Sequence, residues 1–273
     1  MKIKAPLTIF LVFILIALII YFVSGNDFYI YNFTYIGAAL AIGIGLLVNG
    51  YKYGRNVVMF GVGCYLLIFL GIINHENMLI SGFWYYLFLG VFEAAVIHYL
   101  VAKILGPLFF GRGWCGYACW TAMVLDLLPY KVPQNPRKNF GYIRYILFVA
   151  ILCFVSGLFL FKVSNLEMIM YYIFIIGNVL YYAVGISLAF ILKDNRAFCK
   201  YVCPITVFLK ATSYFSYLRV TVDEEKCVNC NKCLNSCPMD VNMLNNSRKR
   251  ENGTECILCL ECVKNCKVNA LDL

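Results

Sequence analysis

The sequence predicts an all-α transmembrane bundle of about six helices, followed by a small cysteine-rich α+β domain at the C-terminus. Hydrophobic residues make up 62% of the chain and charged residues only 14%. The mean hydropathy of +0.77 lies outside the range of water-soluble domains. Apolar runs long enough to cross a hydrocarbon layer of about 30 Å recur over the first two thirds of the chain. Eight of the fourteen cysteines then fall within residues 220–273.

The apolar runs divide the first domain, residues 1–219, into six expected spans. They cover residues 6–23, 34–48, 56–73, 82–105, 142–161 and 168–192. The second is the weakest of the six, because it is short and rich in glycine. The first has an alternative interpretation as a cleaved signal peptide, since Val23 and Gly25 suit a cleavage site, although its apolar run is long for such a segment.

Lysine and arginine are distributed unevenly between the expected loops, and loops rich in these residues stay on the cytoplasmic side. One side holds fifteen of them: Lys2, Lys4, Lys52, Arg55, Lys103, Arg112, Lys131, Arg137, Lys138, Arg144, Lys193, Arg196, Lys200, Lys210 and Arg219. The other side holds only Lys162. We therefore expect a multi-pass protein of the cytoplasmic (inner) membrane with both termini in the cytoplasm. The net charge of +9 then reflects the orientation of the chain in the membrane. The expected partner of these positive charges is membrane lipid and not nucleic acid.

A change of composition near Val220 marks the second domain, residues 220–273, which holds eight acidic and seven basic residues. It contains two motifs of the spacing C-x2-C-x2-C-x3-C. This spacing is typical of bacterial ferredoxins with two [4Fe-4S] clusters, in which the fourth cysteine of each motif ligates the other cluster. We therefore expect an α+β ferredoxin-like fold on the cytoplasmic side. The expected ligands are Cys227, Cys230, Cys233 and Cys266 for cluster 1, and Cys256, Cys259, Cys262 and Cys237 for cluster 2.

Two other uses of these eight cysteines fit the pattern less well. Pairs of cysteines two residues apart also suit structural zinc, but two complete ferredoxin repeats favour clusters. A disulfide framework conflicts with the reducing cytoplasm in which the domain is expected. Pro238 follows the first motif, whereas Lys267 follows the second, which loosens the turn after Cys266 without removing a ligand.

Another cysteine pattern occurs twice in the transmembrane domain, within residues 111–121 and 196–206. Both copies read R-x-aromatic-C-x-Y-x-C, and each follows an expected span on the cytoplasmic side. These common features predict a parallel internal repeat about a pseudo-twofold axis along the membrane normal. Such an axis brings together the thiols of Cys115, Cys119, Cys199 and Cys203.

Four converging thiols at the edge of the membrane suggest a third iron–sulfur cluster. Cysteines four residues apart share one face of a helical turn, so two such pairs can clamp a compact cluster. Arg112 and Arg196 precede the first cysteine of each copy and can offset the negative charge of a thiolate-ligated cluster. Thiol–disulfide exchange and simple packing remain alternatives. Cys64 and Cys153 stand alone within spans and are expected to be small buried hydrophobes.

The elements GRGWCGYACW and CKYVCP, followed by two ferredoxin motifs, resemble the NapH/NosR type of polytopic iron–sulfur membrane proteins. The resemblance runs from the fourth expected span to Leu273. It implies a quinol-linked or flavin-linked electron conduit, although no flavin-binding extracytoplasmic domain is visible. Members usually carry C-x3-C-P in both copies, whereas Trp120 follows Cys119 here. This departure puts the geometry of the first element in doubt, but not its cysteines.

Two ionisable residues of the fourth expected span, Glu93 and His98, suggest a quinol site, because buried charge in a membrane needs a function or a partner. The alternative is that they satisfy each other or a tyrosine. A haem is disfavoured, since His75, the other histidine, belongs to the opposite loop. No hydrolytic or phosphate-binding motif is present in the sequence.

The function that these patterns favour is a membrane-bound iron–sulfur relay between a membrane or extracytoplasmic redox partner, with quinol as a candidate, and a cytoplasmic protein partner. Any enzyme activity would come from an oxidoreductase complex of the quinol-dehydrogenase type that contains the chain. The alternative is a maturation factor that supplies electrons for assembling another metalloenzyme.

Overall fold

A computed structural model describes residues 4–51, 53–92 and 94–273. Within these residues, five helices are long and apolar enough to cross a membrane. They are α1 (Lys4–Ser24), α2 (Phe28–Val48), α3 (Gly54–Cys64) continued by the π-helix η1 (Tyr65–Ile73), α9 (Ile143–Leu160) and α10 (Leu166–Leu192). At 1.5 Å per residue, a helix of 20 residues covers the hydrocarbon layer of about 30 Å. The five helices are therefore compatible with a membrane protein.

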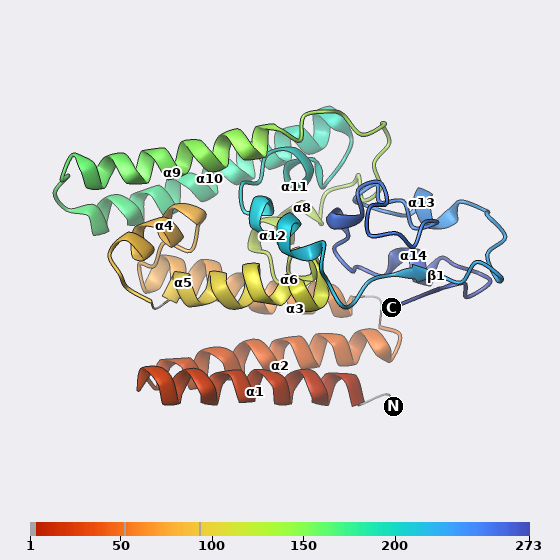
Figure 1. Cartoon of the computed structure of the whole chain (residues 1–273), viewed down its shortest axis with the longest axis horizontal. Helices are drawn as coiled ribbons and strands as arrows, with labels where there is room; N and C mark the ends of the chain where they lie inside the picture. The colour runs from red at the N-terminus through yellow and green to blue at the C-terminus, as the bar shows by residue number, and fades with distance from the viewer. Residues whose placement is uncertain (1–3, 52, 93) are drawn as a thin grey trace.

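The long helices lie side by side, and the C-terminal domain sits at one end of the bundle (Figure 1). Helices α1 and α2 form one pair and α9 and α10 another, with α3 and a second group of helices between them. Many outward side chains of these helices are apolar and exposed, such as Leu15, Val149 and Ile176. Both chain termini lie at the end that carries the C-terminal domain.

Shorter elements connect the long helices and carry the cysteines. In the bundle they are α4 (Ile80–Phe88), α5 (Ala94–Tyr99), the π-helix η2 (Leu100–Leu105), α6 (Gly106–Phe110), α7 (Gly113–Tyr117), α8 (Trp120–Leu125), α11 (Ala197–Tyr201) and α12 (Thr206–Ser213). The C-terminal domain contains α13 (Lys232–Asn235), the 3-10 helix η3 (Gly253–Glu255), α14 (Glu261–Lys264), and an antiparallel pair of strands, β1 (Thr221–Val222) and β2 (Leu271–Asp272).

The expected span at 82–105 is not a single helix, so this prediction is wrong. Helix α4 ends at Phe88, Gly90 adopts a left-handed φ of +72°, and α5 begins at Ala94. A left-handed residue breaks the helical hydrogen-bond ladder, and glycine adopts this conformation without steric cost. The apolar run is thus divided between the nine residues of α4 and a shorter apolar helix, residues 95–110.

The chain before α4 folds into the interior of the bundle. Asn77, Met78 and Ile80 are fully buried although 74–79 is not helical. The Asn77 side chain supplies hydrogen bonds to backbone groups in this region, where the helical ladder is missing. Its Nδ2 donates to the Met170 carbonyl at 3.0 Å, and its Oδ1 accepts from the Leu79 amide at 3.0 Å. Non-helical backbone at membrane depth is tolerated where protein surrounds and satisfies it in this way.

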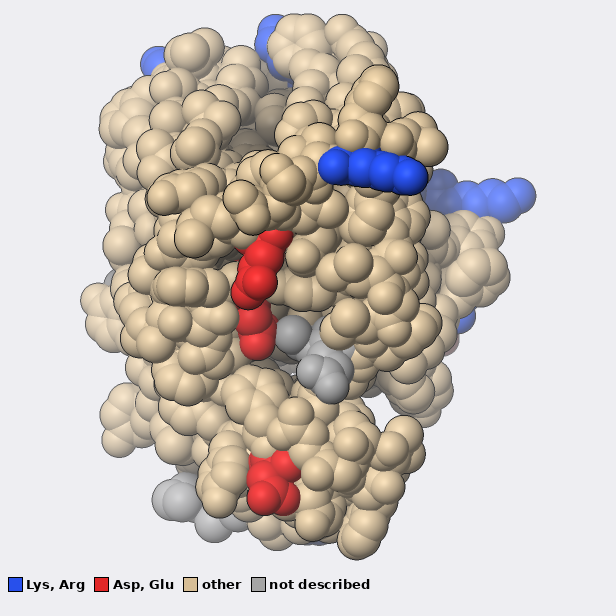
Figure 2. Space-filling view, turned by 90° about the vertical axis from the view of Figure 1, so that its left-hand side faces the viewer, with Lys and Arg blue, Asp and Glu red and all other residues tan. Residues whose placement is uncertain are grey.

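The two ends of the bundle differ in charge. The end far from the C-terminal domain faces the viewer in Figure 2, and most of its surface is neither acidic nor basic. The cationic residues of the 111–144 and 193–219 segments instead lie near the C-terminal domain, where several of them pair with its carboxylates. The arrangement agrees with the uneven distribution of Lys and Arg in the sequence.

Candidate functional site

Two cavities in the C-terminal domain are lined by the cysteines of the two ferredoxin motifs. Cys227, Cys230, Cys233 and Cys266 line one. Cys237, Cys256, Cys259 and Cys262 line the other. Each cavity therefore receives three thiols from one motif and the fourth thiol from the other motif, which is the grouping predicted from the spacing.

The two motifs have matching backbone conformations. Residues before and after the second cysteine are left-handed in both copies, with φ of 51° and 59° at Asn229 and Asn231, and 51° and 61° at Leu258 and Leu260. Leucine rarely adopts this conformation, at a cost of about 1–2 kcal/mol per residue. In the second motif, the loop therefore holds Leu258 and Leu260 in a backbone conformation that leucine disfavours.

Backbone amides also approach the fourth thiol of each motif in the same way. The Val241 amide donates to Cys237 Sγ at 3.4 Å, and the Ala270 amide donates to Cys266 Sγ at 3.3 Å. Amide donors to sulfur stabilise thiolates and raise the potential of the clusters they ligate. The four thiols and nearby donors of each cavity fit a [4Fe-4S] cluster. Among the described residues, no three His, Cys, Asp or Glu side chains are placed to share a single metal ion.

The two cavities differ in their surroundings. In the first, Cys230 is exposed and its neighbour Val228 is 64% exposed. In the second, Cys237, Cys259 and Cys262 are all buried. Burial, followed by Cys259, Cys256 and Cys237, raises the pKa of the Cys262 thiol, so the four side chains interact closely. The first cavity opens to the outside, and the second faces the helix bundle.

The two C-x3-C elements have the same local structure. The first cysteine of each pair, Cys115 or Cys199, lies in a five-residue helix, α7 or α11. The second cysteine, Cys119 or Cys203, follows the end of that helix. The expectation that each pair shares one continuous helical turn is therefore only partly correct, since each helix ends before its second cysteine.

Reciprocal hydrogen bonds join the two copies. Arg112, from the first copy, donates from Nη2 to the Cys199 carbonyl at 3.3 Å. Arg196, from the second copy, donates from Nη1 to the Cys115 carbonyl at 3.0 Å. Both arginine side chains are almost fully buried. The exchange of equivalent bonds is what a pseudo-twofold relation between the copies requires.

The four C-x3-C thiols are close enough to interact electrostatically. Burial, and then Cys199, Cys119 and Cys115, raise the pKa of the Cys203 thiol. Burial raises the pKa of Cys199 to about 12, although Arg196 acts in the opposite direction. A raised pKa makes the Cys199 and Cys203 thiols poor nucleophiles, because thiolate is the reactive form. The same group becomes a good ligand set when a metal centre stabilises the thiolates.

Lys103 adds a buried positive charge beside these thiols, which the sequence analysis did not single out. It is 3% exposed, and its Nζ lies 4.7 Å from the centroid of the Trp114 ring. It interacts electrostatically with Cys115, Cys119 and Cys203, and no carboxylate pairs with it among the described residues. Its signal in the sequence is an isolated lysine within the apolar run 94–110, since such residues need a partner.

Glu255, immediately before the second ferredoxin motif, is also outside the predicted site. It is fully buried and accepts from Arg112, from Arg137 and Arg144 at 3.1 Å each, and from Lys210 at 3.1 Å. Burial alone would raise the pKa of its carboxyl, but these four cations lower it to about 2. The cations belong to the helix bundle and its connecting segments, so this carboxylate anchors the ferredoxin domain on the bundle.

Close backbone packing joins the first C-x3-C element to the second ferredoxin motif. A Cβ atom at Gly116 would lie 2.2 Å from the Ile257 carbonyl oxygen, and Tyr117 Oη donates to the Leu258 carbonyl at 3.0 Å. On the second copy, Lys200 Nζ lies 2.5 Å from Asp240 Oδ2, three residues after Cys237. Both C-x3-C elements therefore contact the half of the ferredoxin domain that holds the buried cavity.

The remaining predicted residues are not brought into this site. Cys64 is half-buried, with its Sγ 3.7 Å from Met123 Sδ. Cys153 is exposed on α9, so the expectation that it is buried is wrong. Glu93 lies outside the described residues. His98 is buried, its ring centroid is 5.2 Å from that of Trp114, and its Nε2 has no hydrogen-bond partner.

Two family models match the chain. A "4Fe-4S dicluster domain" matches residues 219–267. A "4Fe-4S binding domain" matches twice, at residues 95–139 and 178–218, which are the segments that contain the two C-x3-C elements. Neither description names the NapH/NosR type, so that resemblance stays a prediction.

The chain also matches distant relatives, at less than 30% identity. Two uncharacterized proteins of Methanocaldococcus jannaschii are 28% and 27% identical, over 65% and 63% of this chain and 70% and 76% of their own lengths. YccM of Escherichia coli, named as a candidate electron transport protein, is 22% identical over 72% of this chain and 59% of its own length. No solved structure matches. With the paired cavities and the dicluster match, the chain is an iron–sulfur protein with two [4Fe-4S] clusters.

Proposed function

We propose that this chain is a membrane-bound electron-transfer protein that relays electrons between a redox partner at the membrane and a soluble partner in the cytoplasm. The observation that carries the proposal is the contact between the C-x3-C elements and the buried cavity of the ferredoxin domain, formed by Gly116 against Ile257. Redox groups that exchange electrons must lie close together, and at Gly116 the backbones of the two regions are in direct contact. The name of YccM agrees with such a role.

The ligand sets of the proposal follow the two cavities. Cluster 1 is assigned to Cys227, Cys230, Cys233 and Cys266, and cluster 2 to Cys237, Cys256, Cys259 and Cys262. The exposed Cys230 makes cluster 1 the exit toward a soluble partner. Cluster 2, buried against the bundle, is the entry from the membrane side.

A third iron–sulfur cluster bound by Cys115, Cys119, Cys199 and Cys203 completes the proposed relay. The convergence of these buried thiols supports it, as does the double match to a 4Fe-4S binding domain. The charge balance supports it too, because Lys103 is a buried cation without a carboxylate partner, and a cluster with four thiolates is anionic. Thiol exchange is a weaker alternative, since burial raises the pKa of the Cys199 and Cys203 thiols.

The residues of the chain have separable tasks in this proposal. Bound clusters supply one-electron transfer, at potentials that depend on charge, hydrogen bonds and solvent exposure. The cysteines hold the clusters, the amides of Val241 and Ala270 donate to cluster thiolates, and the bundle excludes water from the C-x3-C thiols. We place the ferredoxin domain on the cytoplasmic side, because most Lys and Arg of the loops lie at that end. Quinol remains the candidate membrane partner. Of the two residues predicted for a quinol site, His98 is the one that the structure describes, and it would accept a proton from the quinol.

Iron analysis of the full chain tests the proposal. Anaerobically purified protein should hold about twelve iron atoms with a third cubane, or about ten with a [2Fe-2S] centre. Cys199→Ser should remove the surplus and leave about eight, with the ferredoxin signals in electron paramagnetic resonance unchanged. Cys153→Ser is the matched control, because this cysteine lies on the outer face of α9 and should not affect iron. A full complement of about eight in the unmodified protein would contradict the third cluster.

A further inference from the structure

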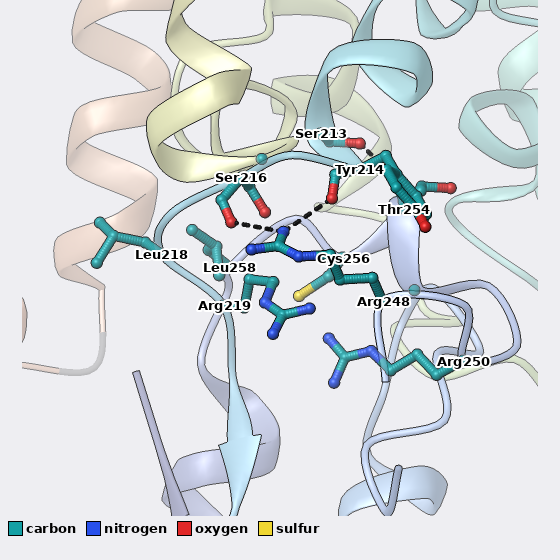
Figure 3. A pocket seen from close by; sticks show the side chains of 12 residues that line it. Ser213, Tyr214, Ser216, Leu218, Arg219, Arg248, Arg250, Thr254, Cys256 and Leu258 are labelled. Atoms are coloured by element: carbon teal, nitrogen blue, oxygen red, sulfur yellow. Dashed lines mark hydrogen bonds between the residues drawn. The ribbon is translucent and has the colours of Figure 1, made fainter. Parts of the chain in front are cut away.

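A third pocket, which shares Cys256 with the second cysteine-lined cavity, lies where the end of α6 meets the 213–219 segment and the 248–256 loop (Figure 3). Three arginines line it, Arg219, Arg248 and Arg250. Figure 3 shows their guanidinium groups directed toward a common space beside Cys256. Among the described residues that line the pocket, none is acidic.

Most donor groups of these arginines are unused. Arg248 Nη1 donates to the carbonyls of Tyr214 and Ser216 at 2.9 and 3.1 Å, and Arg250 Nη1 donates to the Val220 carbonyl at 3.0 Å. Among the described residues, no hydrogen bond or ion pair partner is found for Arg219, although the pocket lining includes hydroxyl acceptors such as Ser213 and Thr254. Since each guanidinium carries five N–H donors, the pocket presents many free donors, and backbone carbonyls hold two of the three guanidinium groups, those of Arg248 and Arg250, in place.

The concentration of positive charge also points to an anion. Arg250 is only 7% exposed, and it remains charged because guanidinium does not deprotonate in proteins. Burial, followed by the charges of Arg248 and Arg250, lowers the pKa of Arg219, so the three groups repel one another. An anion between them would remove this repulsion, and arginine pairs preferentially with phosphate and carboxylate oxygens.

The position of the pocket favours an anion at the membrane surface. The amides of Tyr217 and Leu218 donate to the carbonyls of Leu108 and Phe109, in the last turn of the apolar helix 95–110, at 2.8 and 2.7 Å. Three aromatic side chains on this side are largely exposed: Phe109 at 64%, Phe215 at 66% and Tyr217 at 83%. Tyrosine is enriched at the interface between membrane and water, and exposed phenylalanine beside it provides apolar surface for contact with lipid.

We propose that the pocket binds a phosphate group, and the position beside exposed aromatics favours the phosphate of an anionic phospholipid over a free phosphate ion. Arg219 is the principal recognition residue, because its guanidinium has no other partner. Arg248 and Arg250 complete the site, and their carbonyl contacts fix their orientation. Basic pockets at the cytoplasmic membrane surface recognise anionic headgroups by this chemistry.

Lipid binding by the full chain with its clusters loaded tests the proposal. Native mass spectrometry in detergent would compare phosphatidylglycerol with phosphatidylcholine at matched acyl chains. Arg219→Gln should weaken phosphatidylglycerol binding about tenfold, as expected for the loss of a charged hydrogen-bonded pair. Lys249→Gln is the control, because it removes the same charge from an exposed neighbour that does not line the pocket, and it should change binding less than about twofold.

The iron content of each variant shows whether it is folded, and Arg219→Lys replaces Arg219→Gln where the latter loses iron. Inorganic phosphate is the second probe. If only other anionic lipids displace phosphatidylglycerol, the site is assigned to lipid. If inorganic phosphate binds in a way that depends on Arg219, and anionic lipid is not preferred, the site is assigned to a free ion. Equal effects of the Arg219 and Lys249 substitutions, or no effect of either, would overturn the proposal.

Discussion

The ferredoxin domain and the C-x3-C elements both place cysteines by means of a repeat, but they use different physical means. In the ferredoxin domain, short loops with left-handed residues such as Asn231 and Leu260 bring three thiols of one motif together. In the C-x3-C elements, two segments more than eighty residues apart are joined by buried arginines. Arg112 and Arg196 each donate a hydrogen bond to a backbone carbonyl of the other copy. The first arrangement is local, and the second depends on the whole bundle.

The difference matters for stability and for redox behaviour. A local loop keeps its shape when a distant residue changes, whereas a buried ion pair that loses one partner leaves an uncompensated charge. We therefore expect substitutions near the C-x3-C site to have larger effects than comparable substitutions in the exposed ferredoxin motif.

The largest effect is expected for Glu255→Gln, at the contact between the two regions. The substitution leaves Arg112 and Arg144 buried without their carboxylate, at a cost of about 3–5 kcal/mol in the free energy of unfolding. Glu261→Gln is the control, because its pair with Lys264 is exposed and worth at most about 1 kcal/mol. Chemical denaturation followed by cluster absorbance measures both, and equal losses would contradict the comparison.

The same carboxylate predicts a pH dependence. The pKa of Glu255 falls from an ordinary 4.5 to about 2 in the folded protein, so its stabilising contribution is complete above about pH 4.5. The contribution is lost as the pH falls from there through about 2, because the carboxyl must then be protonated. Denaturation midpoints at a series of acidic pH values should decline in the unmodified protein and decline less in Glu255→Gln. Parallel curves would show that another carboxyl controls the acid limit.

A smaller effect is expected at the contact of the two backbones. In Gly116→Ala, the new Cβ meets the Ile257 carbonyl oxygen, so the ferredoxin domain must shift, at a cost of about 1–3 kcal/mol. Gly157→Ala is the matched control in α9, where nothing lies within 4 Å and alanine favours the helix. Limited proteolysis near residue 219 measures the docking. Similar cleavage rates in the two variants would argue against tight contact at Gly116.

Lys103→Met tests whether the two regions differ in how a nearby charge affects the reduction potential of the cluster that each binds. Loss of a buried cation beside the C-x3-C thiols should lower the potential of a cluster bound there, by on the order of 50–100 mV for a charge at this range. The potentials of the two ferredoxin clusters should change much less. Lys103→Arg keeps the charge and serves as the control. Redox titration followed by electron paramagnetic resonance separates the signals, and a uniform shift of all of them would contradict a local role for Lys103.

The smallest effect tests the ferredoxin loops. Asn231 is exposed with a left-handed φ of 59°, so Asn231→Leu should lower the free energy of unfolding by about 1 kcal/mol. Asn235→Leu makes the same replacement at an exposed site within α13, where it should have no comparable cost. Thermal unfolding with cluster absorbance as the signal distinguishes them. A larger loss than for Glu255→Gln would reverse the comparison.

The sequence by itself determined the two ferredoxin motifs and the repeat of the C-x3-C pattern, and it predicted most of the apolar helices. The domain boundary near Val220 stays a prediction. These features depend on composition and on short, regular spacings, and the energies that decide them are local. The crossed grouping expected from the ferredoxin spacing is also the grouping of cysteines that lines the two cavities.

Only the tertiary structure decided the rest. The break at Gly90 was hidden, because an apolar run reads the same whether it forms one helix or two shorter ones. The roles of Glu255 and Lys103 depend on partners far away in the chain, and a single glutamate or lysine carries no sign of its partner. The arginine pocket likewise arises only when the 213–219 segment meets the 248–256 loop. Long-range burial of charge thus decides the site, because the cost of an unpaired charge depends on the surroundings that the fold creates.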